Sequence, residues 1–195
     1  MADGGWRVAI LGDTAVEAIW QALQWAAIIV GSTAGVLALI ALAGCFCPRS
    51  YTARRALRSQ RPPEEVWQVI SDFAAAPSWH PELKTVERLP DKNGHEVWRE
   101  TDRRGYPVQL ETVEALAPLR LVRHISDENG PFSGQWEFDL QPAGQGSRLT
   151  LTERGQIPNP FFRVMFWTFM TPTFYLEMYL RALATKLGDP PQLER

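Results

Sequence analysis

The longest run of apolar positions in the chain lies near its start, between Trp25 and Phe46. These 22 residues include no charged side chain. At about 1.5 Å of rise per residue, a helix of this length reaches roughly 33 Å, which matches the ~30 Å hydrocarbon thickness of a bilayer. The pattern therefore predicts a transmembrane helix over residues 25–47, preceded by an N-terminal segment, 1–24. The alternative interpretation is a buried helix of a soluble protein.

The charges on either side of this run indicate how it crosses the membrane. Five arginines and no acidic residue occur in the segment 48–61, directly after the run. Before the run, three acidic residues outnumber one arginine. A cleaved signal peptide shows the opposite arrangement, with basic residues before a shorter apolar core. The positive-inside tendency predicts a single-pass membrane protein with its N-terminus outside and its C-terminal domain in the cytoplasm.

The segment after the run begins with mixed signals and then a clear helix start. Positions 50–59 alternate loosely between apolar and polar residues, which is typical of a strand, although their arginines also suit a solvated linker. A Pro-Pro-Glu-Glu motif at 62–65 favours a helix start, because proline fits the first turn and carboxylates fit the positive end of the helix dipole. Residues 74–81 contain two prolines and are expected to form a loop or one helical turn.

From residue 85 to residue 155 the pattern changes to short segments separated by turn residues. We expect six strands, at 85–89, 95–102, 108–115, 119–126, 134–141 and 147–154. The clearest alternation places Trp136, Phe138 and Leu140 on one face, and their polar neighbours on the other. Short links between the segments predict an antiparallel meander with one apolar face and one solvated face.

The chain closes with a long helical region. An Asn-Pro pair at 159–160 is typical of a helix start, and Gly188 before two prolines is typical of a helix end. Four leucines between 176 and 187 recur at spacings of four, three and four, so they form a stripe suited to the apolar face of the sheet. Pro172 is expected to kink or split the helix, with Thr171 capping the second piece.

Composition excludes several classes of partner and cofactor. Residues 62–195 contain 14 Lys and Arg against 19 Asp and Glu, a net charge of 14 − 19 = −5, which argues against nucleic acid as a partner. Cys45 and Cys47 are the only cysteines, so neither a disulfide framework nor a paired zinc motif is expected. They are interpreted as apolar filler, with lipidation as the lesser alternative. We expect no metal and no cofactor, and a short tail over 189–195.

The order of these elements resembles the helix-grip fold of the START-like superfamily, or SRPBCC, which includes the polyketide cyclase/dehydrase and lipid transport proteins. The resemblance covers residues 51–188. It is carried by Pro63-Glu64-Glu65-Val66-Trp67, Asp72-Phe73, Trp79-His80-Pro81, Trp136-Glu137-Phe138, Leu149 to Glu153 and Asn159 to Arg163. The resemblance implies an α+β fold in which a curved antiparallel sheet wraps a long C-terminal helix. It also implies an apolar cavity that binds a hydrophobic small molecule, such as a lipid, a quinone or a polyketide-like compound.

Large rings and a few polar groups make up the candidate site. The candidate ligand-binding residues are Trp79, Trp98, Arg99, Arg123, Trp136, Phe138, Glu153, Tyr175 and Tyr179. Rings of this kind suit planar or aliphatic ligands, although each one taken singly has a dry core as its alternative role. Glu153 continues the apolar phase of its strand, and an inward carboxylate needs a partner. We expect it to contact a ligand, Arg99 or Arg123, unless the strand end turns it outward.

The residues favour a binding protein over an enzyme. His80, Glu153 and Asp102 are the only candidates for general acid or base, and none has a partner fixed by local spacing. No catalytic residue is therefore assigned. Two alternatives stay open: a cyclase/dehydrase-like enzyme that acts on an apolar substrate, and a membrane-tethered module that docks a protein partner, whose identity is unknown.

A second membrane signal lies within residues 161–170. The segment is apolar around almost its whole helical circumference, interrupted by Arg163 and Thr168. It is either buried beneath loops or placed at the bilayer interface. We favour the interface, with Phe162, Phe166 and Trp167 in the bilayer and Arg163 at the headgroups.

Overall fold

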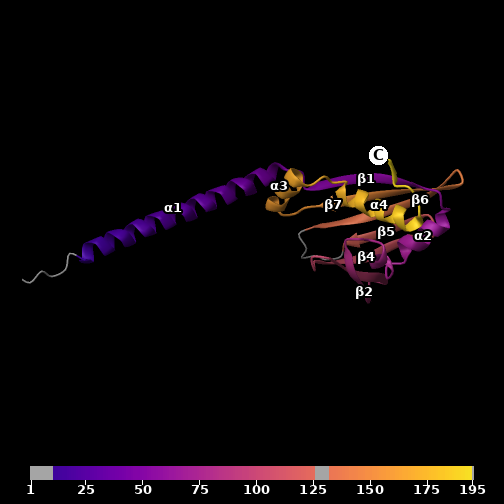
Figure 1. The fold of residues 1–195 in the computed structure, drawn as a ribbon, viewed down its shortest axis with the longest axis horizontal. Helices are drawn as coiled ribbons and strands as arrows, with labels where there is room; N and C mark the ends of the chain where they lie inside the picture. Colours follow the sequence, from indigo (N-terminus) through magenta and orange to yellow (C-terminus); the bar gives the residue numbers. More distant parts are fainter. Residues whose placement is uncertain (1–10, 126–131, 195) are drawn as a thin grey trace, which may run out of the picture.

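The structure is a computed structural model, and it describes residues 11–125 and 132–194. A long helix, α1 (Leu11–Phe46), projects from a domain built around one curved sheet (Figure 1). The part from Val16 to Phe46 is long and apolar enough to cross a membrane. Its most apolar 18-residue stretch has a mean hydropathy of 2.3 and is not buried against the rest of the protein. The helix begins well before Trp25, because acidic residues suit the first turns of a helix.

The eight strands found in the described residues belong to one antiparallel sheet. They are β1 (Ser50–Ser59), β2 (Leu83–Lys92), β3 (His95–Asp102), β4 (Pro107–Leu116), β5 (Arg120–Ile125), β6 (Ser133–Ala143), β7 (Gly146–Gln156) and β8 (Gln192–Glu194). Their order in the sheet is β2-β3-β4-β5-β6-β7-β1-β8. The meander runs from β2 to β7. β1 pairs with β7, and β8 forms the edge of the sheet beside β1. The predicted link between the strands at 119–126 and 134–141 falls mostly on residues 126–131, which lie outside the described residues.

The strand pairing shows the structure of the segment 50–59 and of the C-terminal tail. The ten residues of β1 pair with β7 along their whole length, so the segment 50–59 is a strand and not a solvated linker. β8 lies in the predicted tail and pairs with β1 at three positions. Sequence patterning missed β8 because three residues are too few to show an alternation.

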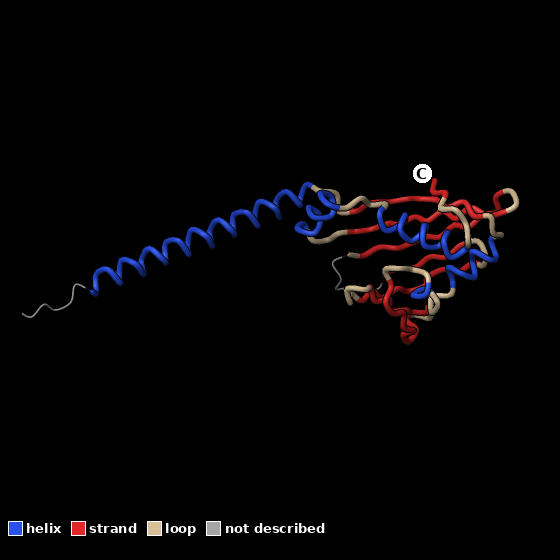
Figure 2. Tube along the Cα trace, viewed as in Figure 1, coloured by secondary structure: helices blue, strands red, loops and turns tan. Residues whose placement is uncertain are grey.

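The helices are α2 (Pro63–Ser71), the short 3₁₀ turn η1 (Ala76–Ser78), α3 (Pro160–Phe169) and α4 (Phe174–Leu187). The helical region is split near Pro172, as predicted. Thr173 is the N-cap of α4, so the prediction for Thr171 is wrong; the chain is extended at Met170, and the backbone oxygen of Thr171 accepts from the backbone nitrogen of Phe174. α4 lies across one face of the sheet (Figure 2).

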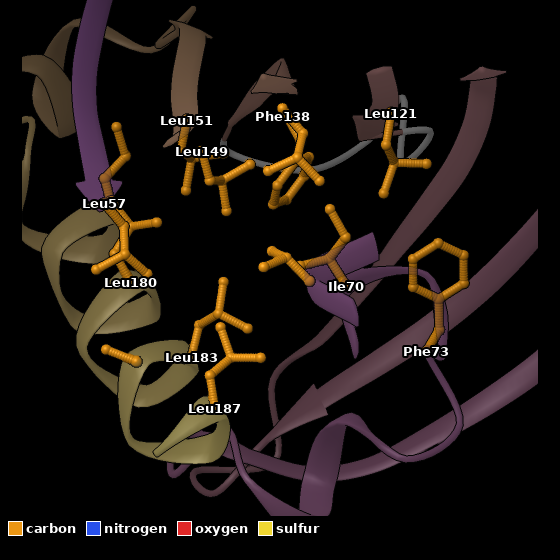
Figure 3. Close-up of a cluster of buried hydrophobic side chains, with 14 of the residues drawn as sticks. Leu57, Ile70, Phe73, Leu121, Phe138, Leu149, Leu151, Leu180, Leu183 and Leu187 are labelled. Carbon is orange, nitrogen blue, oxygen red and sulfur yellow. The ribbon is translucent and has the colours of Figure 1, made fainter. Parts of the chain in front are cut away.

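One part of the space between α4 and the sheet is filled by packed aliphatic side chains (Figure 3). We call this part the leucine half. Its members are Leu57, Leu140, Leu149, Leu151, Leu180, Leu183 and Leu187. Most of them have no exposed surface, and Ile70 of α2 packs against the same cluster. Burial of this kind removes aliphatic surface from water and stabilises the fold.

Candidate functional site

A row of inward side chains crosses five strands at the level next to the leucine half. The register aligns Ala53 of β1, Glu153 of β7, Trp136 of β6, Arg123 of β5 and Thr112 of β4 as successive Cα partners. We call this set the inner row. Because neighbouring strands lie about 4.8 Å apart, the backbones at Glu153 and Arg123 are roughly 10 Å apart, with Trp136 between them.

Tyr179 of α4 is the centre of an aromatic cluster that faces the inner row. Its ring centroid lies 5.6 Å from those of Trp136 and Phe138, and 5.4 Å from those of Trp79 and His80. The contacts with Trp79, Trp136 and Phe138 are edge-to-face, which is a favourable geometry for aromatic pairs. The cluster therefore joins α4, the sheet and the segment after η1. We call the inner row together with this cluster the aromatic half.

Arg123 is the only arginine of the inner row, and its side chain is buried, with 8% of its surface exposed. Its Nη1 donates to a carboxylate oxygen of Glu100 on β3. Its guanidinium also lies 4.0 Å from the ring centroid of Phe73, a cation–π geometry. The positive charge of Arg123 is therefore offset by Glu100 within the site.

Several buried polar atoms of the aromatic half have no hydrogen-bond partner within residues 11–125 and 132–194. They are Nδ1 of His80, Oγ1 of Thr112, Nε and Nη2 of Arg123, and Oε2 of Glu153. We call these the open polar atoms. Buried polar groups in native proteins are nearly always paired, so these atoms have hydrogen-bonding capacity that water or a ligand can satisfy.

Burial shifts the pKa values of the titratable groups around Tyr179. Desolvation lowers the pKa of His80 below its ordinary 6.5, while Glu100 and Glu82 act in the opposite direction. Desolvation raises the pKa of the Tyr179 hydroxyl, which Arg123 partly opposes. The imidazole and the phenol are thus both neutral at pH 7, so they contribute hydrogen-bonding capacity without charge.

Glu153 points into the fold, and its partner is a tyrosine. The hydroxyl of Tyr51 donates to Oε1 of Glu153 at 2.8 Å. Desolvation raises the pKa of Glu153, and hydrogen bonds from Tyr51 and Trp136 act in the opposite direction. The expected ion pair with Arg99 or Arg123 is wrong, because Arg123 is held by Glu100 and Arg99 faces the other side of the sheet.

Arg99 lies on the outer face, because β3 turns Trp98 and Glu100 inward. Its Nη1 pairs with Oε2 of Glu87 on β2 at 3.0 Å; the Glu87 side chain is exposed and that of Arg99 is partly exposed. Trp98 borders the aromatic half through Phe73, with ring centroids 5.7 Å apart. Arg99 therefore does not join the other candidate residues.

Two further candidates have roles outside the cluster. Tyr175, near the start of α4, is exposed and packs edge-to-face on Phe174. Asp102 ends β3, where its Oδ1 accepts from the backbone nitrogens of Arg104 and Tyr106 and so shapes the following turn. Neither residue belongs to the aromatic half.

The segment proposed to meet the membrane forms α3, beside the end of α1 (Figure 1). Phe166 is buried and stacks on Tyr51, with ring centroids 4.7 Å apart, so its predicted exposure is wrong. Arg163 is also buried and donates to backbone oxygens, so its guanidinium is not free to contact lipid headgroups as predicted. Phe162 is half-buried, whereas Trp167 is exposed. Because the segment is apolar on almost all sides, its sequence does not show which face of the helix packs against the domain.

A polar surface hollow lies at the other end of the sheet, where β1 ends and β6 turns into β7. Its volume is about 420 Å³. Its lining includes Arg58, Gln60, Gln145 and Gln192, and none of the candidate residues. Such walls do not suit a hydrophobic molecule. Within the described part of the chain, no three His, Cys, Asp or Glu side chains are placed to hold a metal ion.

Comparison with known proteins agrees with this geometry. A family model described as polyketide cyclase / dehydrase and lipid transport matches residues 52–188. No curated protein matches the chain.

Solved structures share the fold at low sequence identity. The Zhui aromatase/cyclase of Streptomyces sp. R1128 has a TM-score of 0.59 and 14% identity, over 71% of this chain and 94% of its own. A norcoclaurine synthase point mutant of Thalictrum flavum has a TM-score of 0.56 and 14% identity, over 71% and 94%. A START superfamily protein of Mycobacterium smegmatis has a TM-score of 0.53 and 17% identity, over 70% and 97%. At these identities the likeness concerns the fold.

Proposed function

Because the chain belongs to the polyketide cyclase/dehydrase and lipid transport family, we propose that it is a membrane-anchored protein that binds a hydrophobic small molecule in the aromatic half. The observation that carries this proposal is the grouping of the open polar atoms beside three aromatic rings that are only partly buried, those of Trp79, Trp136 and Tyr179. A dry core would close over the rings and leave no buried polar atom unsatisfied.

The rings of this region have the surface that a ligand would cover. Trp79, Trp136 and Tyr179 are each half-buried, whereas the leucines beside them are closed. The hydroxyl of Tyr179 lies deep enough for burial to raise its pKa, yet the side chain keeps accessible surface. A ring that lines an internal space combines both properties, which supports a ligand position against Trp136 and Tyr179.

The polar groups indicate the chemistry of the ligand. Nε and Nη2 of Arg123 are donors, so they suit an oxygen acceptor on the ligand. An anionic acceptor would add a negative charge next to Glu100 in a buried region, which is costly. The site therefore favours a neutral, ring-bearing molecule with a carbonyl-type oxygen towards Arg123. A hydroxyl elsewhere on the molecule would suit Oε2 of Glu153.

The anchor would hold this site at the membrane. α1 contains a candidate span from Val16 to Phe46, and five arginines occur in residues 48–61. This arrangement supports the domain lying on the cytoplasmic side. A tether of this kind keeps the site close to apolar molecules that dissolve in the bilayer, which raises their effective concentration.

A cyclase-like enzyme is the second candidate, and one observation favours it. His80 and Glu153 both have shifted pKa values and both carry an open polar atom in the aromatic half. Such groups are typical of general acids and bases. The distinguishing result would be a co-purified ligand that is converted to a second compound on incubation with the protein.

Native mass spectrometry of the full chain in nanodiscs tests the proposed function. We expect a bound small molecule that survives release, and tighter binding of 2-methylanthraquinone than of 2-methylanthracene, which lacks the two oxygens. Oleate, an anionic probe, should bind more weakly than the quinone. The double variant Arg123→Met/Glu100→Gln removes the buried pair without leaving one charge alone, and it should lose the preference for the quinone.

Arg99→Met is the matched control, because Arg99 lies on the outer face of β3. It should keep the preference for the quinone. A chain that carries no small molecule and binds none of the three probes would contradict the proposed function. Oleate binding that exceeds quinone binding and depends on Arg123 would contradict the neutral ligand class.

A further inference from the structure

We infer that α3 docks on the inner surface of the bilayer beside the span and presents one apolar stripe to lipid. The stripe consists of Phe161, Met165 and Phe169. This inference rests on the membrane anchoring proposed above and adds the surface that meets the bilayer. It places one side of the aromatic half against the membrane.

The length of α1 sets the depth of α3. From Trp25 to Phe46 the helix rises about 32 Å at ~1.5 Å per residue, close to the ~30 Å thickness of the hydrocarbon core. Tryptophan favours the membrane–water boundary, so Trp25 at the outer boundary places Phe46 at the inner one. Any element fixed to the last turn of α1 then lies at the inner boundary.

α3 is fixed to that last turn by specific contacts. Nη1 of Arg163 donates to the backbone oxygen of Gly44 at 2.9 Å, and Nη2 donates to that of Pro158 at 2.9 Å. Nε1 of Trp167 donates to the backbone oxygen of Pro48 at 3.1 Å. The helices also touch closely at Gly44, where a Cβ would overlap the backbone of Pro160.

The buried guanidinium of Arg163 explains why an arginine is compatible with this depth. The carbonyl group of Gly44 belongs to the last turn of α1, where backbone oxygens lack partners within the helix. A cation is favourable at that negative end of the helix dipole. Arg163 thus binds α1 to α3 and leaves the apolar stripe free of charge.

The exposed side of α3 is more apolar than a water-facing helix would be. Residues 161, 165 and 169 are spaced by four and lie on one face, and the exposed fraction is 46% at Met165 and 81% at Phe169. Phe46, at the end of the span, is 84% exposed, so the apolar surface continues from α1 to α3.

The charges around the stripe suit an anionic leaflet. The sequence has no acidic residue from 154 to 176, and Arg49 and Arg54 are exposed at the start of the sheet. Basic residues near the cytoplasmic leaflet are attracted to its acidic lipids. Both the apolar surface and the charge therefore select the bilayer as the occupant of this face.

The opposite side of α3 contacts the aromatic half. Phe166 stacks on Tyr51, whose hydroxyl binds Glu153 beside Trp136 in the inner row. α3 and Tyr51 thus separate the lipid from the inner row. A ligand that exchanges with the bilayer on this side has to pass α3.

Spin labels on the full chain in nanodiscs with acidic lipid test the docking. Cys45 and Cys47 are first replaced by alanine, and single cysteines are placed at Met165, Phe169 and, as the control, Leu116 at the far end of β4. We expect labels at 165 and 169 to collide at least fivefold more often with oxygen than with a nickel chelate, relative to Leu116. Collision rates at 165 and 169 that equal those at 116 would overturn the inference. Immobile labels that meet neither reagent would also overturn it, because they indicate a protein partner.

A second variant separates this inference from the proposed function. Gly44→Leu should push α3 away from α1, so the label at 169 should lose its excess of oxygen collisions. The fraction of chains that carry a bound ligand, measured by native mass spectrometry, should stay unchanged. Labels exposed to water in a chain with Gly44 intact that carries its ligand would contradict only the docking of α3. Labels exposed to lipid on a chain that binds no ligand would contradict only the proposed function.

Discussion

The two halves of the space beneath α4 are built from different side chains. In the leucine half, aliphatic groups from the sheet and α4 close completely and contain no polar side-chain atom. In the aromatic half, the rings of Trp79, Trp136 and Tyr179 keep accessible surface, Phe138 is buried, and the open polar atoms lie nearby. One part of the space is therefore closed by aliphatic packing, while the other has aromatic surface and polar atoms that the proposed ligand would cover.

The boundary between the halves follows the chain direction. α4 runs from Phe174, near α3, to Leu187, at the far end, so Tyr179 meets the inner row and the last three leucines of the helix meet the leucine half. The same direction places the aromatic half on the side of α3 and the span. If the aromatic half is the binding site, as proposed, substitutions at the two ends of α4 should affect binding and stability separately.

The largest expected effect is on stability, from Leu183→Ala in the leucine half. The cavity left by this change should lower the free energy of unfolding by about 2–5 kcal/mol. Urea unfolding of the full chain in detergent micelles, followed by near-ultraviolet circular dichroism, measures the loss. Binding of 2-methylanthraquinone by the remaining folded chain should change less than threefold. A tenfold loss of binding would break the separation between the halves.

Trp136→Leu should produce the reverse pattern. The ring is half-buried and an aliphatic side chain still covers the sheet, so we expect a stability loss of only about 1–2 kcal/mol. Quinone binding should fall at least tenfold, about 1.4 kcal/mol, because the ring that stacks on the ligand is gone. The same unfolding and mass-spectrometric titrations measure both quantities. Unchanged binding would remove Trp136 from the site.

Glu153→Gln tests the aromatic half through the pH dependence of the free energy of unfolding. Burial raises the folded-state pKa of Glu153 above its ordinary 4.5, so the folded chain holds the proton more tightly than the unfolded chain. This contribution to stability is full below pH 4.5 and is lost as the pH rises through the folded-state pKa. The variant, which keeps an oxygen for Tyr51, should be more stable than the wild type at pH 7, by about 1 kcal/mol or less.

Unfolding midpoints measured from pH 4 to pH 8 check this prediction. Glu87→Gln is the control, because Glu87 is exposed on the outer face and should leave the pH profile as it is. A wild-type profile that is flat over this range, or a variant that is less stable at pH 7, would show that burial does not raise the pKa of Glu153.

Arg99→Met should have the smallest effect. Its exposed ion pair with Glu87 contributes at most about 0.5 kcal/mol, and its side chain faces away from the ligand. Unfolding and quinone binding should both match the wild type within error. A clear loss of binding would mean that the outer face of β3 contributes to the site.

Much of the fold was readable from local patterns. The alternation around Trp136 and Phe138 identified the inner face of β6, and the phase of Glu153 identified its inward direction. Leucine spacing identified the buried stripe of α4. These features depend on neighbours in the sequence, so periodicity is enough to find them.

The remaining features depend on contacts between distant segments. Arg99 and Arg123 cannot be told apart by type, because β3 carries polar residues on both faces and only the register shows which face is inner. The register of β4 shifts between Thr112 and Glu114, which breaks the phase of its alternation. The partner of Arg163 lies 119 positions away in the sequence, so no local signal reveals it.

Photolabelling of the full chain in nanodiscs with a diazirine-bearing anthraquinone, followed by peptide mapping, tests directly whether a ligand binds in the aromatic half. We predict adducts on Trp136 and Tyr179 that disappear when excess 2-methylanthraquinone is added, and no competed adduct on Leu183. Adducts confined to α1 and the outer side of α3, or labelling that the competitor does not reduce, would contradict a binding site in the aromatic half.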